Sequence, residues 1–428
     1  MKSKIDKLLF CVISPVNLAV FRIAFGFFSF LEIIYFYKTY LIEDYILQPK
    51  VLFNYSFLPV LPLPETALDI ILGITLISTV FIIIGKFYRV AIITFFIGFT
   101  YFFLLDKAYY NNHMYLFSLL AFLLIFIPAD GALAFRGKKK SKPVYGWHLR
   151  ILQFQFIVVY FFGGVAKING DWLMFYEPMR TILEYKDIYS EELSMFLAYS
   201  GLLFDLFIGF FLLNKRTRIP AAIFVLVFNI TNHLIFDDIN IFPFFMMGSL
   251  VLFFELDKMS FFSRFNKPVD TKQTENSNKL VLIGVGIYVL IQITMPIRHY
   301  FIPGNVDWTG EGQRFAWRMK IQTREIRECK FAIFDLNKKT IYPVEINAHI
   351  NAIQLQQMTH SPKMILDFAH YLKEYARKEG LNNVMIKARI TVKYNQREAV
   401  EILSPDIDLS KEKWSSFSHN KWINPLQN

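Results

Sequence analysis

The chain has 428 residues, of which 54% are hydrophobic and only 19% are charged, and 47 of them are phenylalanine. Soluble globular chains average about 45–50% apolar and about 25% charged residues, so this composition excludes a disordered chain and favours a membrane protein. The net charge of +11 would suggest a nucleic-acid partner in a soluble protein. Here, however, the basic residues fall in short connections between long apolar runs, which is typical of membrane topology.

Long apolar segments dominate the first 297 residues. About 20 helical residues are needed to cross a bilayer, and nine segments reach or approach that length, although the fourth and the eighth are short. We therefore predict an α-helical polytopic bundle over 1–297 with about nine transmembrane helices, near 16–38, 66–85, 88–105, 112–128, 147–166, 193–213, 219–236, 239–256 and 279–297.

From residue 298 to 428 the sequence reads as a small extramembrane α+β domain. Residues 330–346 predict a hairpin, because two apolar runs flank the turn NKK. Ser361 followed by Pro362 predicts the start of a helix that Gly380 ends. The alternation of apolar residues over 384–394 predicts a half-buried strand.

The orientation follows from the Lys and Arg residues in the connections. With nine crossings, one set of connections holds 18 basic residues and the alternate set holds 6. Because cytoplasmic loops carry the excess of basic residues, we predict a multi-pass membrane protein with a cytoplasmic N-terminus and an extracytoplasmic C-terminal domain.

Titratable residues at the outer ends of three predicted helices suggest an enclosed site. They are His113, Lys167 and His233, accompanied by Asn111–Asn112 and Asp237–Asp238. Each has an ordinary interpretation: a helix-end lysine usually extends to the interface, and a single interfacial histidine is usually structural. The hypothesis of a functional site rests on their position at the same depth in the membrane, below the soluble domain on the same side of the membrane.

Three ionisable residues lie deeper in the predicted spans. Arg22 and Glu32 in the first span are too far apart to pair with each other, so we expect them to bind neighbouring helices and hold the bundle together. We expect the same of Asp205, with Arg22 as a possible partner. The sequence contains no phosphate-binding glycine loop, no His-x-x-x-His or Cys-x-x-Cys pair and no nucleophile elbow, and we predict no metal site.

Several blocks resemble the vitamin K-dependent gamma-carboxylases and their bacterial relatives. The resemblance extends from the first helix to the last residues, and a short chain of this kind resembles a bacterial homologue. The blocks are LAVFRIAFG (18–26), LLDKAYYNNHMYL (104–116), VVYFFGGVAKINGDW (158–172), FDLFIGFFLL (204–213), NHLIFDDINIFPF (232–244), GQRFAWRMKIQTR (312–324), SPKMILDFAHYLKEYA (361–376) and KWINP (421–425).

The resemblance implies a lyase that couples two reactions. Vitamin K hydroquinone, which is reduced menaquinone or phylloquinone, is oxidised by O2 to the epoxide, and CO2 is added to glutamate side chains of a peptide or protein to give gamma-carboxyglutamate. Oxygenation of the quinol generates the strong base that this carboxylation needs. Lys167 corresponds by position to the family's catalytic lysine, which deprotonates the quinol. Burial disfavours the ammonium form of a lysine, which led us to expect a neutral amine.

Further site residues are implied by the same blocks. Asn112 and His113 match the Asn-His pair that binds and stabilises the oxygenated quinone, and His233 matches another histidine of the quinone site. Arg324 and Trp317 are implied to bind the substrate. The chain departs from the animal enzymes in being shorter, in lacking the cysteines of their disulfide, and in carrying Ala166 where a second lysine is common.

Two alternatives remain open at this stage. The chain could be a non-enzymatic transport or immunity protein of the wider superfamily, although such proteins lack the C-terminal domain. It could also be a quinol epoxidase that is coupled to another substrate.

Overall fold

The structure is a computed structural model that describes residues 4–58, 60–135, 143–237, 239–263 and 278–427. Asp238 therefore lies outside the described residues. In the described part, seven helices are long and apolar enough to cross a membrane, by length and composition. They are α2 (Val16–Lys38), α3 (Glu65–Ile84), α4 (Tyr88–Leu105), α6 (Gly146–Ala166), α9 (Glu191–Leu213), α10 (Arg218–Ile235) and α13 (Lys279–Ile297).

The predicted polytopic bundle is confirmed, and the fourth and eighth predicted spans are shorter than the rest. They form α5 (Asn112–Phe126) and α11 (Phe242–Gly248), which continues into η3 (Ser249–Leu252). At 1.5 Å per residue, α5 is about 22 Å long, which is less than the apolar thickness of a bilayer, about 30 Å. Its start is set by the Asn111 side chain, and its end precedes Pro128, since the residue before a proline avoids the helical conformation.

Shorter elements lie before, between and after the long helices. They are α1 (Lys4–Phe10), η1 (Leu41–Leu47), η2 (Lys107–Tyr109), α7 (Gly170–Phe175), α8 (Met179–Tyr185), η4 (Leu256–Lys258), α12 (Ser260–Ser263), η5 (Arg298–Phe301), α14 (Val306–Thr309) and η6 (Ile346–Ala348).

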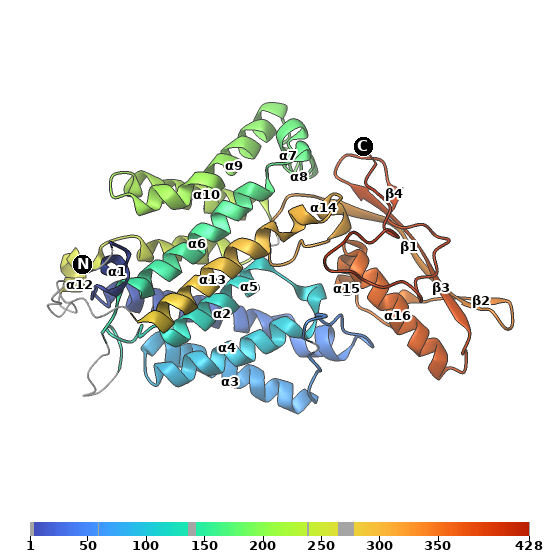
Figure 1. The fold of residues 1–428 in the computed structure, drawn as a ribbon, viewed down its shortest axis with the longest axis horizontal. Helices are drawn as coiled ribbons and strands as arrows, with labels where there is room; N and C mark the ends of the chain where they lie inside the picture. The colour runs from blue at the N-terminus through green and yellow to red at the C-terminus, as the bar shows by residue number, and fades with distance from the viewer. Residues whose placement is uncertain (1–3, 59, 136–142, 238, 264–277, 428) are drawn as a thin grey trace.

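The long helices form two flanks around a central layer. Helix α3 contacts α2 and α4 on one flank, and α9 contacts α6 and α10 on the other (Figure 1). The approach of α6 and α9 requires glycine: a Cβ atom on Gly164 would lie 2.8 Å from the Leu206 nitrogen, and one on Gly209 would lie 2.9 Å from Ile157. Small residues of this kind let membrane helices pack closely, and here they set the distance between α6 and α9.

The C-terminal region forms a four-stranded antiparallel sheet in the order β2-β1-β3-β4, covered by helices. Its elements are β1 (Arg324–Asp335), β2 (Thr340–Pro343), α15 (Ala352–Thr359), α16 (Pro362–Lys378), β3 (Val384–Tyr394) and β4 (Val400–Glu401). The predicted hairpin is confirmed by the pairing of Asp335 with Thr340. The helix after Ser361 and the alternating strand over 384–394 are also confirmed, and Gly380 follows α16 with a φ of +84°.

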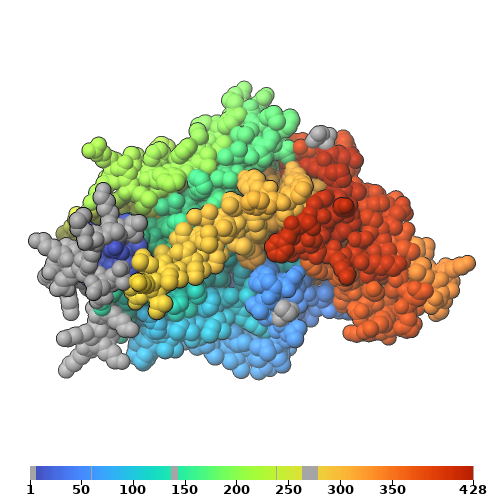
Figure 2. All heavy atoms as spheres, in the orientation of Figure 1, coloured from blue at the N-terminus to red at the C-terminus, as the bar shows by residue number. Residues whose placement is uncertain are grey.

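The bundle and the C-terminal sheet share their apolar cores. Phe315 and Trp317, from the segment that leads into the sheet, pack in the core of the bundle. In return, Phe53 and Ala108 from the loops of the bundle pack in the core of the sheet. Figure 2 shows the blue N-terminal loops lying against the red and orange C-terminal region. The segments predicted as domains 1–297 and 298–428 therefore interlock.

Buried polar contacts also connect the two regions. Lys107, on η2, forms an ion pair with Asp367 of α16. Beside it, Gln354 donates to Asp106 at 2.7 Å, and burial raises the pKa of that carboxyl group to about 6. Because buried polar groups are normally paired, these contacts favour one placement of the sheet on the bundle.

Arg22 is fully buried on α2 and binds backbone carbonyl groups. Its guanidinium donates to the carbonyl oxygens of Ile82 and Ile83 at the end of α3. It also donates to those of Ala129 and Leu133 in the segment after α5. Carbonyls at helix ends lack intrahelical partners, and the five donors of an arginine can satisfy several at once. The expectation that Arg22 holds the bundle together is met by these contacts.

We predict that Arg22→Met destabilises the protein by about 3 kcal/mol, because it leaves buried carbonyls without donors. The measurement is the thermal unfolding midpoint of the intact chain in detergent. Arg216→Met, at an exposed position in the α9–α10 connection, serves as the control and should leave the midpoint unchanged. Equal midpoints for both variants would contradict the assigned role of Arg22.

Candidate functional site

A cavity of about 760 Å³ lies among α6, α9, α10 and α11. The start of α5 contributes to one wall, and residues 318–320 contribute from the segment that leads into the C-terminal sheet. Most of the lining is apolar, and a few polar side chains converge on it. This combination is typical of small-molecule sites. The polar or charged side chains considered below are Asn112, His113, Lys167, Asp205, Arg318 and Lys320.

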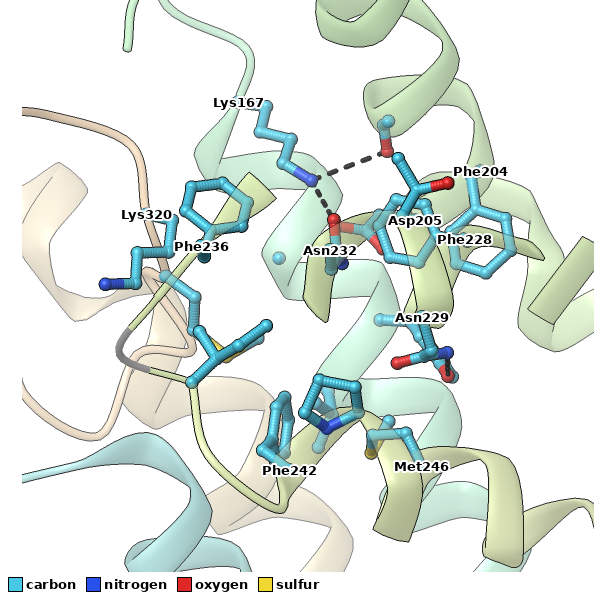
Figure 3. Close-up of a pocket in the computed structure, with 18 of the residues that line it drawn as sticks. Lys167, Phe204, Asp205, Phe228, Asn229, Asn232, Phe236, Phe242, Met246 and Lys320 are labelled. Atoms are coloured by element: carbon cyan, nitrogen blue, oxygen red, sulfur yellow. Dashed lines mark hydrogen bonds and ion pairs between the residues drawn. The ribbon is translucent and has the colours of Figure 1, made fainter. Parts of the chain in front are cut away.

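Lys167 lies directly after α6 and reaches across to α9. Its Nζ atom is 2.5 Å from Oδ2 of Asp205 and 3.5 Å from the carbonyl oxygen of Gly201. The same amine lies 5.0 Å from the ring centre of Trp172 and 5.8 Å from that of Phe228. Figure 3 labels Lys167, Asp205 and Phe228 at the cavity. Both members of the ion pair are buried, so Lys167 is not an interfacial lysine that extends into solvent.

The expected pairing of Asp205 with Arg22 is wrong. Arg22 binds the backbone carbonyls described above, and Asp205 pairs with Lys167 instead. The sequence placed both residues in membrane spans but held no information on which helices are neighbours. The small residues Gly164 and Gly209 in the two segments are the signal that could have paired α6 with α9.

His113 occupies the first turn of α5 and pairs with Glu32 of α2. Its Nε2 atom is 3.1 Å from Oε1 of Glu32, and both side chains are buried. The contact holds the Nε2 edge of the ring against this carboxyl group. The other carboxylate oxygen, Oε2, has no hydrogen-bond partner among the described residues. This contact of Glu32 with a residue of the cavity lining was not predicted from the sequence, which assigned Glu32 only to holding the bundle together.

Asn112 joins the bundle to the segment before β1. Its Oδ1 atom accepts from the Tyr110 hydroxyl at 3.0 Å, and its Nδ2 atom donates to the carbonyl oxygen of Arg318 at 3.4 Å. Arg318 is itself held by Asp307, with contacts of 2.8 and 2.5 Å. The C-terminal region therefore closes one side of the cavity through a fixed arginine.

The other three residues implied by the resemblance do not line the cavity. His233 is exposed on α10, with its ring 4.8 Å from that of Phe244. Trp317 is buried in the bundle core, where it stacks on Tyr115 at 4.9 Å. Arg324 lies inside the C-terminal region between aromatic rings, and burial lowers its pKa to about 10. The structure brings Lys167, Asn112 and His113 together and leaves these three apart.

The cavity extends to the outer face of α9 and α10, which bears exposed apolar side chains. Six residues of its lining are between 47 and 66% exposed: Phe196, Leu203, Phe207, Phe211, Phe224 and Val227. In a helix long enough to cross a membrane, such a face is directed to lipid. Among the residues that the structure describes, no group of three or more His, Cys, Asp or Glu side chains is placed to hold a metal ion.

The fold and this cavity define a multi-pass membrane protein with a buried polar site beneath an α+β domain. Residues 10–257 match the family model described as the HTTM domain, which covers more than half of the chain. Residues 277–428 match the model described as the vitamin K-dependent gamma-carboxylase, lumenal domain. The chain belongs to the vitamin K-dependent gamma-carboxylase family. No solved structure matches it.

The pairing of Glu32 with His113 predicts a fixed histidine tautomer. In Glu32→Leu the ring loses its partner, so the imidazole nitrogen resonances should shift and broaden as two tautomers become populated. Nitrogen-15 NMR of histidine-labelled protein measures this, with the signal assigned from His113→Ala. Ser29→Ala, one turn away on α2 and also buried, controls for general disturbance of the helix. An unchanged His113 spectrum in Glu32→Leu would count against the pairing.

Proposed function

We propose that this protein is an integral membrane vitamin K-dependent gamma-glutamyl carboxylase and epoxidase. In this proposal vitamin K hydroquinone and O2 are converted to the epoxide while CO2 is added to glutamate side chains of a peptide or protein. The observation that carries the proposal is the convergence of Lys167, Asn112 and His113 on one apolar cavity in a chain of this family.

Lys167 is the residue that we assign as the base. Its amine lies in the cavity lining, away from bulk water, and is the group that would take the hydroxyl proton of the quinol at Nζ. Asn112 and His113 provide further polar groups of the lining, and we assign them to binding the oxygenated ring. The surrounding phenylalanine side chains exclude water, which would quench a strong base.

The apolar face of α9 and α10 supports a lipid-soluble substrate. Reduced menaquinone and phylloquinone carry long isoprenoid chains, which partition into the bilayer. The exposed lining residues of α9 and α10 would let such a chain remain in contact with lipid while the ring reaches Lys167. His233 also lies on α10 but outside the lining, so its assignment to the quinone site finds no support in the geometry.

The glutamate side chain has a different route in this proposal. Arg318, Met319 and Lys320 line the cavity from the segment before β1, and Gln357 does so from α15. A peptide that is held by the C-terminal region would therefore approach the cavity from this more polar side. Arg324 and Trp317 support the segment from within the two cores rather than by touching the cavity, so we assign them an indirect part in substrate binding.

The test is an assay of the purified chain with vitamin K hydroquinone, labelled bicarbonate and a Glu-containing peptide, in which epoxide and carboxylated peptide are both measured. The proposal requires both products. Epoxide without carboxylated peptide would favour a quinol epoxidase coupled to another substrate. Neither product would favour the non-enzymatic alternative.

We predict that Lys167→Ala and Lys167→Arg each lower epoxide formation at least about 100-fold, the usual range for loss of a general base. Arginine would preserve a positive charge but stays protonated at any accessible pH. A small added amine should partly restore Lys167→Ala by acting as base in the vacated space. Unfolding midpoints measured in parallel control for folding. Near-normal epoxide formation by Lys167→Arg would eliminate the base assignment.

The two histidines provide a matched comparison. His113→Ala should lower both epoxidation and carboxylation by an order of magnitude or more, because its ring lines the cavity. His233→Ala should have a much smaller effect, since its ring lies outside the lining. The measurement is the initial rate of formation of each product, normalised to the amount of folded protein. If the two variants lose activity equally, the cavity does not define the site.

We also propose that the N-terminus is cytoplasmic and that the C-terminal domain is extracytoplasmic, because the number of basic residues alternates between high and low from one connection to the next.

In a chain whose two cysteines are replaced by serine, we predict that a cysteine at Lys338, on the exposed β1–β2 turn, reacts with an impermeant maleimide from outside intact cells. A cysteine at Lys215, between α9 and α10, should react only after permeabilisation. The reverse pattern would overturn the orientation.

A further inference from the structure

The groups around the Lys167 amine are of the kinds that attract a cation. A carboxylate oxygen lies 2.5 Å away, a carbonyl oxygen lies at 3.5 Å, and two aromatic rings face the nitrogen. Carboxylates, carbonyl dipoles and aromatic faces all attract a cation. The expectation of a neutral amine considered burial alone, and the structure adds these partners.

An ammonium group cannot accept a proton, so a base at this position must first release one. The Gly201 carbonyl oxygen is far too weak a base to take it. The carboxylate of Asp205 is the remaining hydrogen-bond partner of Nζ within the described part of the chain. Asp205 is also placed for this role, because it lines the cavity and makes its hydrogen bond to Lys167 alone among the described residues.

We propose that Asp205 is the proton acceptor that makes Lys167 a base, so that the two side chains work as one unit. This inference rests on the proposed function and deepens it. A proton moves from Nζ to Oδ2, which breaks an N–H bond, forms an O–H bond and leaves a neutral amine beside a carboxylic acid. The amine lone pair then takes the hydroxyl proton of the quinol. The products are an ammonium group, a carboxylic acid and the quinol anion, with no electron transferred between molecules.

The charge balance explains why a paired acid suits an apolar cavity. Before the step, the pair and the quinol each carry no net charge. Afterwards the pair carries +1 and the quinol anion −1, so opposite charges face each other at short range, where low polarity strengthens their attraction. If Asp205 stayed ionised, its negative charge would neutralise the ammonium group of Lys167. The quinol anion would then be a buried charge without a counter-ion, which is costly.

The position of the carboxylate is fixed by close contacts on α6. A Cβ atom on Gly163 would lie 3.3 Å from Oδ2 of Asp205, so the glycine leaves room for the carboxylate directly beside the end of α6. A Cβ atom here would require the carboxylate to shift by a few tenths of an ångström. The same glycine lines the cavity, so the pair and the cavity wall form one unit.

The first test is Asp205→Asn in the epoxidation assay. The amide keeps the size of the side chain and an oxygen that can accept from Nζ, but it cannot take a proton at neutral pH. We expect epoxide formation to fall at least about 100-fold, as in Lys167→Ala. Ser194→Ala, also buried on α9 but outside the cavity lining, is the matched control. Retained or increased activity in Asp205→Asn, as a desolvated neutral lysine would give, would overturn the inference while leaving the proposed function in place.

Rescue by an added amine distinguishes proton transfer to Asp205 from a role in which Asp205 only binds the amine. In Lys167→Ala, methylamine is titrated and both the half-saturating concentration and the plateau rate are measured, and the titration is repeated in Lys167→Ala/Asp205→Asn. If Asp205 accepts the proton, the plateau should fall at least tenfold. An equal plateau with a higher half-saturating concentration would mean that Asp205 only holds the amine, and would overturn the inference.

A spectroscopic measurement tests the inference without relying on the rate of product formation. Under anaerobic conditions, binding of vitamin K hydroquinone should produce an infrared band of a protonated carboxylic acid in the wild-type chain that shifts on aspartate carbon-13 labelling. The band should be missing in Asp205→Asn and present in Ser194→Ala. If the wild-type chain forms no epoxide but shows this band, the proposed function fails and the pair remains. If the band is absent from the wild-type chain, the inference fails.

Discussion

The bundle is governed by one constraint, which is that an ionised group inside a membrane must find its partner within the protein. Each ionisable residue that the sequence places deep in a span meets this requirement. Arg22 binds carbonyls at the end of α3 and in the segment after α5, Glu32 binds His113, and Asp205 binds Lys167. The first contact joins helices, whereas the other two place a carboxylate beside a cavity residue. The three contacts therefore differ in whether the partner of the ionised residue lies in the backbone between helices or in the lining of the cavity.

Much of the architecture could be predicted because it depends on local patterns. Apolar length predicted the spans, and the alternation of residues 384–394 predicted β3. The short fourth helix was also recognisable, since Asn111 can cap its start and Pro128 follows its end. These features need only the chemistry of neighbouring residues, which a single sequence contains.

The partners within the site could not be predicted, because they depend on which helices lie side by side. Asp205 was expected near Arg22, and Glu32 was expected only to hold the bundle, although each contacts a cavity residue. The resemblance to a family located Lys167, Asn112 and His113 correctly on one cavity. It did not separate them from His233, Trp317 and Arg324, which lie elsewhere. Contacts between distant segments are set by tertiary packing, which a residue pattern alone does not specify.

The sharing of cores between the bundle and the sheet has a consequence for biosynthesis. Phe315, Trp317 and Arg318 complete the bundle core and one wall of the cavity, yet they lie about three quarters of the way along the chain. During translation, every long helix is made before this segment leaves the ribosome. The cavity then stays open until the segment has folded onto α5 and α6. Assembly of the site is thereby coupled to late steps of membrane insertion, so a chain that stalls after α13 would hold an unfinished cavity.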